Sequence, residues 1–164
     1  MSEKLYYLGV KAFIQNKAGD VLLLKVDTSS FKNHNGLDYW DIPGGRVMVG
    51  ENALETLQRE VEEETGIHTL TNMQSLGFVL STIEIPMKGD GSAGLILSLY
   101  SCVGDDAVEI KLSNEHTDFA WVAFDEALER LMHKYPKELL NLTQSLKPVS
   151  SNERCDSFQA LRVM

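Results

Sequence analysis

Apolar runs along the chain predict four long strands, which come in two pairs. Residues 5–15 and 21–26 read as strands, and the polar stretch between them has the composition of a turn, so we expect a β-hairpin. Residues 75–85 and 95–103 are apolar and rich in β-forming side chains. The Gly-rich residues 89–94 between them open no helix, which favours a flexible hairpin connection over a phosphate-binding loop.

Capping residues mark a helix in the middle of the chain. Asn52 has the side chain of an N-cap, and Glu55 three residues later completes a capping box. We expect the helix to run to about Thr65 and to end at Gly66, because glycine adopts the left-handed conformation that commonly follows a helix.

The C-terminal third predicts one short strand and two helices. The strand covers residues 120–124, Asp125 caps a helix over residues 126–133, and Pro136 is the first residue of a final helix that reaches about residue 146. Strands with a few helices that do not strictly alternate predict an α+β fold with a mixed sheet.

The length and composition fit a single globular domain. The chain has 164 residues, of which 43% are hydrophobic and 24% are charged, and we expect residues 1–147 to form one domain. Residues 148–164 form a tail that starts polar and then offers Phe158 and Leu161. Three outcomes stay open for this tail: docking on the domain, docking on a second subunit of a homodimer, or disorder.

The net charge limits the classes of partner that we expect, and the cysteines indicate the cellular compartment. The net charge of −9, from 24 acidic and 15 basic residues, argues against a nucleic-acid partner and would repel a phosphorylated substrate unless a divalent cation intervenes. Cys102 and Cys155 are far apart and make no zinc or disulfide pattern, so we expect a cytoplasmic protein. No apolar run is long enough for a membrane helix, and we expect no membrane partner.

The expected helix between residues 52 and 65 carries the most chemical information. Apolar residues three and four apart form one stripe along it: Leu54, Leu57 and Val61. At ~100° per residue, Glu60, Glu63 and Glu64 fall within an arc of roughly 100° beside that stripe. Like charges so close destabilise a helix, and a hard cation such as Mg²⁺ turns their repulsion into coordination. A solvated acidic face is the alternative interpretation of the same three residues.

A longer spacing pattern surrounds these glutamates. It reads Gly, five residues, Glu, seven residues, Arg-Glu-apolar-any-Glu-Glu-any-Gly-apolar. The matching residues are Gly45, Glu51, Arg59, Glu60, Val61, Glu63, Glu64, Gly66 and Ile67. On these residues the chain resembles the Nudix hydrolases, whose signature it matches at every specified position. The flanking segments extend the resemblance over about residues 5–135.

The resemblance implies a fold and a set of metal ligands. It implies an α/β/α sandwich with a mixed sheet that holds one to three Mg²⁺ or Mn²⁺ ions. Four residues are then expected at the metal: Glu60, Glu63, Glu64 and the carbonyl of Gly45. By the same resemblance, Arg59 is expected to orient a glutamate, Glu51 or Glu60, and not to touch the substrate.

Two residues are candidates for the base that takes the proton of the attacking water. Within the family this base comes from the signature helix or from a later loop, so the resemblance points to Glu63 or to Glu115. Glu115 belongs to the polar residues 113–118, which we interpret as a loop before a strand. His116 is more simply a loop residue, and Asp118 is a weak candidate for contact with a nucleobase.

Together with the resemblance, these residues predict a metal-dependent hydrolase with a nucleotide-like small-molecule substrate. It would cleave a diphosphate linkage, in a nucleoside triphosphate or a nucleoside diphosphate derivative, by direct attack of metal-activated water, because no Ser or Cys stands beside a His as a covalent nucleophile. Two alternatives stay open. One is a non-catalytic nucleotide-sensing module, although such relatives commonly lose signature glutamates. The other is a diphosphate isomerase, which would need a catalytic cysteine where Cys102 reads as a core residue.

Overall fold

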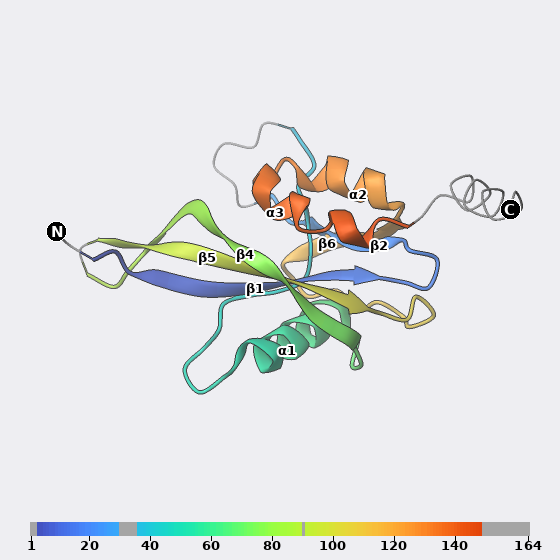
Figure 1. Cartoon of the computed structure of the whole chain (residues 1–164), viewed down its shortest axis with the longest axis horizontal. Helices are drawn as coiled ribbons and strands as arrows, with labels where there is room; N and C mark the ends of the chain where they lie inside the picture. Colours follow the sequence, from blue (N-terminus) through green and yellow to red (C-terminus); the bar gives the residue numbers. More distant parts are fainter. Residues whose placement is uncertain (1–2, 30–35, 90, 149–164) are drawn as a thin grey trace, which may run out of the picture.

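The computed structural model describes residues 3–29, 36–89 and 91–148, and within them six strands form one mixed sheet (Figure 1). The strands are β1 (Tyr6–Gln15), β2 (Val21–Val26), β3 (Trp40–Asp41), β4 (Thr71–Pro86), β5 (Ser92–Val103) and β6 (His116–Val122). Their order across the sheet is β3-β2-β1-β5-β4, and β6 pairs with β2 outside this path. The two expected hairpins, β1–β2 and β4–β5, are confirmed as antiparallel pairs.

The central pair of the sheet is parallel. Strand β1 pairs with β5 from Tyr6 opposite Gly94 to Gln15 opposite Val103, whereas the other pairs are antiparallel. A parallel pair needs a long crossover connection, and here the chain between the two strands forms β2, β3, the first helix and β4. Strand β1 therefore lies in the middle of the domain.

Helices cover the two faces of the sheet (Figure 1). They are α1 (Ala53–Thr65) on one face, and α2 (Phe124–Leu131), α3 (Lys137–Asn141) and a 3₁₀ turn (Gln144–Leu146) on the other. Side chains alternate between the faces of a strand, so Val10 and Ile14 of β1 pack with Leu57 of α1, while Phe13 packs with Leu131 of α2. The predicted α+β sandwich with a mixed sheet is confirmed.

The elements after residue 113 begin earlier than expected. Strand β6 starts at His116, so His116 and Asp118 belong to a strand and not to a loop. The physical reason is pairing: β2 offers a free edge from Val21 to Val26, and the polar residues of β6 complete it. Helix α2 in turn begins at Phe124 after Ala123, without a side-chain cap, so the prediction that Asp125 caps this helix is wrong.

The predicted final helix is shorter than expected. Pro136 stands at its N-cap position, α3 covers Lys137–Asn141, and a 3₁₀ turn takes up the remaining residues. The expected tail lies outside the described residues except for Pro148, which packs against Gly19. Cys155 also lies outside the described residues.

Among the described helices, none is long and apolar enough to span a membrane.

Candidate functional site

Helix α1 begins and ends at the residues that the sequence marks. The Asn52 side chain accepts hydrogen bonds from the backbone of Leu54 and Glu55 at 3.0 Å each, and the Glu55 carboxylate accepts one from the Asn52 backbone at 2.9 Å. Gly66 follows the helix with a φ of 75°, in the left-handed region. The capping box and the glycine end are both confirmed, and they fix which side chains α1 turns toward the sheet.

The buried stripe of α1 is shifted from the expected one. Leu57 and Val61 are fully buried, but Leu54 is 44% exposed, so its assignment to the stripe is wrong. The stripe continues instead to Glu64, a carboxylate that is only 8% exposed. Helical spacing brings Leu57, Val61 and Glu64 onto one line. Leu54, in the first turn of the helix, lies beside Met73 in a shallow surface depression.

The glycine turn before α1 lies along the edge of β1. The Val10 N–H donates to the Gly45 carbonyl at 2.9 Å, and the Ala12 N–H donates to the Pro43 carbonyl at 2.8 Å. Gly44 has a φ of 144°, and a Cβ there would overlap the Val10 carbonyl and approach the backbone of β1. Only glycine fits this close backbone approach.

Two glutamates of α1 converge on this turn. The Glu64 carboxylate accepts a hydrogen bond from the Gly44 N–H at 2.9 Å. The Glu60 carboxylate lies against Gly45, where a Cβ would overlap it. The Gly45 carbonyl already accepts the Val10 N–H, and a carbonyl oxygen has a second lone pair for another partner. Glu60, Glu64 and Gly45, three of the four expected metal ligands, therefore lie together.

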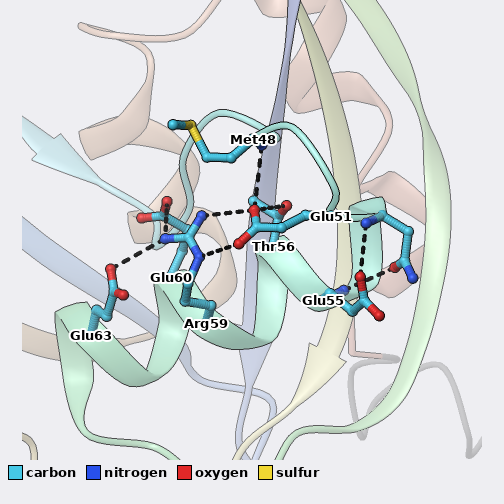
Figure 2. Close-up of polar contacts among 8 residues, drawn as sticks. Met48, Glu51, Glu55, Thr56, Arg59, Glu60 and Glu63 are labelled. Atoms are coloured by element: carbon cyan, nitrogen blue, oxygen red, sulfur yellow. Dashed lines mark hydrogen bonds and ion pairs between the residues drawn. The ribbon is translucent and has the colours of Figure 1, made fainter.

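Arg59 joins three glutamates of the signature (Figure 2). Its Nε and Nη2 donate to the two oxygens of Glu51 at 2.7 and 3.0 Å, and its Nη1 donates to Glu60 at 2.8 Å and to Glu63 at 3.2 Å. The hydrogen bonds from Arg59 and Thr56 lower the pKa of Glu51 to about 2, which keeps this carboxylate ionised. Glu63 is 58% exposed, and Arg59 links it to the others.

Burial makes Glu64 unlike the other glutamates of α1. Loss of solvent raises its pKa to about 7, and the charges of Asp41 and Glu60 add to this, while Lys11 and the Gly44 N–H oppose it. A pKa raised this far means that Lys11 and the Gly44 N–H compensate the charge of the buried carboxylate only in part. Among the described residues, no three acidic, His or Cys side chains are grouped to hold a metal by themselves.

A second buried carboxylate, Asp41 of β3, anchors a network that the sequence did not predict. Lys11 of β1 approaches its two oxygens at 3.2 and 3.3 Å, and Lys134 and the Tyr135 hydroxyl also donate to it. Burial disfavours the charge of Asp41, but the two lysines and the hydrogen bonds outweigh burial and hold its pKa well below the usual range. The signal in the sequence was a lysine at an inward-facing position of an apolar strand.

A cleft of about 500 Å³ opens beside the glycine turn. Its apolar floor comes from β4 and β5, with Ile85, Leu95 and Leu97. Residues 44–46 form part of its lining, and residues 132–136, between α2 and α3, form another part. Three cationic side chains also line it: Lys11, Arg46 and Lys134. An apolar floor with cations at its border suits a ligand that has one apolar and one anionic end.

Glu115 lies in a different place from the glutamates of α1. It lines a polar hollow of about 380 Å³ together with Asp41, His116 and Lys134, and of these only Lys134 also lines the cleft. His116 is buried, and this burial lowers its pKa. Asp118 is exposed on β6 opposite Lys25. The structure thus separates the two candidate bases: Glu63 stands on α1 and Glu115 in the hollow.

The family model, a curated relative and two solved structures all resemble this chain over most of its length. The sequence model of the NUDIX domain matches residues 5–143. The chain is 34% identical to the bis(5'-nucleosyl)-tetraphosphatase [asymmetrical] of Rattus norvegicus over 113 residues, which cover 66% of this chain and 75% of the relative. The MutT protein of Methanosarcina mazei has a similar structure, with a TM-score of 0.65, 29% identity and coverage of 89% of this chain and 96% of that one. An Ap4A hydrolase from C. elegans shares the fold with a TM-score of 0.59 at 19% identity, over 94% of this chain and 98% of that one.

Proposed function

The chain belongs to the Nudix hydrolases, a family of pyrophosphohydrolases, and on that premise we propose that it is a Mg²⁺- or Mn²⁺-dependent hydrolase of a nucleotide-like substrate. Its substrate is a nucleoside triphosphate or a nucleoside diphosphate derivative, and the bond that breaks is a diphosphate linkage. One observation carries the proposal: Glu60 and Glu64 converge on the turn of Gly44 and Gly45, at the border of a cleft with an apolar floor.

The side chains at the turn fit a hard divalent cation. Carboxylate and carbonyl oxygens are the ligands that Mg²⁺ prefers, and Mg²⁺ keeps several waters, so it does not need three side chains of its own. In the proposal Glu60, Glu64 and the Gly45 carbonyl hold the ion, and Glu63 contributes from the outer side. The raised pKa of Glu64 supports this, because a bound cation would supply the counter-charge that the buried carboxylate lacks. When bound, the ion would neutralise charge on the diphosphate and lower the pKa of water.

The other residues position the substrate and move the proton. The apolar floor of the cleft takes the nucleoside end, and Arg46 and Lys134 face its phosphates. Arg59 holds Glu60 in place through its Nη1 while its other nitrogens are fixed by Glu51, so it orients a ligand and does not bind the substrate. Glu63 or Glu115 takes the proton of the attacking water.

The alternatives find less support in the residues of the chain. An isomerase on this fold would need a reactive cysteine, but Cys102 is 2% exposed and burial raises the pKa of its thiol to about 12. A sensing module has no need of the complete set of signature glutamates that this chain keeps.

A single turnover in ¹⁸O-labelled water with Mg²⁺ tests the proposal. The substrate panel should contain nucleoside triphosphates, nucleoside diphosphate derivatives and dinucleoside tetraphosphates, the last because of the name of the rat relative. Direct hydrolysis places one heavy oxygen in one of the two phosphorus-containing products, and its position identifies the phosphorus that is attacked. Substrate bound but not consumed would indicate a sensing module, and a product of unchanged mass would indicate an isomerase. Either result across the panel would overturn the proposal.

A further inference from the structure

Lys11 is a partly buried cation in the middle of β1, beneath the turn that carries Gly44 and Gly45. Its side chain is only 13% exposed, and its neighbours Val10 and Ala12 are fully buried. Burying an ammonium group destabilises a fold unless the charge is compensated and its N–H groups are hydrogen-bonded. The surroundings of Lys11 meet both conditions.

All acceptors of the Lys11 ammonium belong to one short segment. The Nζ donates to the carbonyls of Ile42 and Gly44 at 3.1 Å each, and it pairs with both carboxylate oxygens of Asp41 at 3.2 and 3.3 Å. The backbone of β1 holds the same segment through Pro43 and Gly45. Lys11 thus holds the carbonyls of Ile42 and Gly44, whereas the backbone of β1 holds the carbonyls of Pro43 and Gly45.

The ammonium is itself held in place from the opposite side. Asp41 accepts hydrogen bonds from Lys134 and Tyr135, which belong to the segment between α2 and α3. Lys11 is therefore locked between one carboxylate and two carbonyls. Because Asp41 and the two carbonyls take up the three N–H groups of the Lys11 ammonium, none is left for a substrate phosphate.

We propose that Lys11 is a positioning residue that holds the glycine turn in the geometry needed at the metal site. Lys11 holds the Ile42–Pro43 and Gly44–Gly45 peptides, which lie on either side of the Pro43–Gly44 peptide. In this way it keeps the Gly44 N–H directed to Glu64 at 2.9 Å and sets the position of Gly45 against Glu60. The inference rests on the proposed function, since the turn matters only if Glu60 and Glu64 work there. It adds a residue that lies more than 30 positions before the signature motif in the chain.

The first test uses metal-free protein and needs no substrate. Lys11→Met removes the charge and the donors at nearly the same volume, and Lys25→Met is the matched control, a strand lysine that pairs with Asp38 at 2.9 Å away from the turn. Amide hydrogen exchange followed by NMR should show the Gly44 N–H exchanging at least tenfold faster in Lys11→Met, while the core amide of Val61 keeps its protection. Unchanged exchange at Gly44, or an equal increase at both amides, would overturn the proposal.

The second test measures Mn²⁺ affinity. Lys11→Met removes a positive charge and also loosens the turn, and these two effects change the Mn²⁺ affinity in opposite directions. Removing a positive charge alone would tighten cation binding, whereas a loosened turn should weaken it by roughly 10- to 100-fold, the range for residues that orient metal ligands. With substrate, kcat should fall while KM changes less than about threefold. Equal or tighter Mn²⁺ binding would contradict a positioning role.

Loss of folding and loss of metal binding each give a definite result. If Lys11→Met does not fold, Lys11→Gln, which keeps a side-chain donor, is measured in the same way, and failure of both to fold would assign Lys11 to the fold alone and overturn the proposal. If the wild-type protein neither binds Mn²⁺ nor hydrolyses any substrate, the proposed function fails, while the exchange at Gly44 still decides whether Lys11 holds the turn.

Discussion

The Glu60 carboxylate occupies the space where Gly45 lacks a side chain. A Cβ on Gly45 would overlap the carboxyl group, and even its Oε2 would be only 2.7 Å away. The two residues come from different elements, the turn and α1, so the end of a long side chain of α1 lies directly against the backbone of the turn. Gly45 has no left-handed φ, and its need for glycine is therefore steric.

Gly45→Ala should displace Glu60 and lower kcat at least tenfold, because the methyl group and the carboxylate cannot share this space. A double-mutant cycle with Glu60→Gln is the measurement. If the alanine acts through Glu60, its effect on kcat should be much smaller once Glu60 is already Gln, whereas fully additive effects would contradict the contact as the cause.

Replacing the glutamates at the turn should separate activity from folding. Glu64→Gln or Glu60→Gln is expected to lower kcat by at least two decades, the scale of losing one electrostatic contributor, while the far-UV circular dichroism spectrum stays the same. Glu62→Gln is the control, since Glu62 lies on the same helix and pairs with His68 at the exposed surface. Near-normal turnover of Glu64→Gln in Mg²⁺ would remove that residue from the site.

The stability of the metal-free protein should depend on the ionisation of Glu64. Its pKa is raised from 4.5 to about 7 in the folded protein, so the folded state holds the proton more tightly than the unfolded state. The stabilisation by this proton is fully present below pH 4.5 and is lost as the pH rises to about 7.

Between pH 4 and pH 8, the stability of Glu64→Gln relative to wild type should therefore increase by on the order of 3 kcal/mol. Urea unfolding of both proteins in EDTA measures this difference. Adding Mg²⁺ at pH 8 should reduce it, because the cation supplies the missing counter-charge. A difference that does not change with pH would contradict the raised pKa.

The base can be identified by comparing two variants. Glu115→Gln should lower kcat far more than it weakens Mn²⁺ binding, and it should alter the acidic limb of the pH profile, if Glu115 takes the proton. The same pattern in Glu63→Gln, together with a silent Glu115→Gln, would assign the base to α1. The structure makes the two results distinct, because Glu63 contacts Arg59 and Glu115 lines the hollow beside Lys134.

Local signals account for the parts of the fold that the sequence predicted well. The limits of α1 depend on Asn52, Glu55 and Gly66, which act within a few residues of one another, and the β1–β2 hairpin depends on an adjacent turn. The start of β6 depends instead on pairing with β2, some 90 residues earlier, which no local pattern of His116 to Asp118 reveals. Pairing between distant strands overrides local propensity here.

The same distinction applies to the candidate site. The expected set around Glu60 and Glu64 comes from a contiguous motif, and the structure brings it together with the turn. Asp41 meets Lys11 and Lys134 across sequence separations of 30 and 93 residues, so this network was beyond reach from the sequence alone. Glu64 could be assigned to an arc of the helix, but its burial depends on how α1 rotates over the sheet.

The position of β1 has a consequence for how the protein folds. Its partner on one edge, β5, is synthesised about 90 residues later, and on the other edge it receives the glycine turn. Closing such long loops is entropically costly and slow, and domains dominated by distant contacts fold on the millisecond to second timescale. A ribosome-bound chain that ends before β5 can form α1 but has no completed sheet on which to dock it. We therefore expect catalytic competence to appear only after β5 and β6 have emerged from the ribosome.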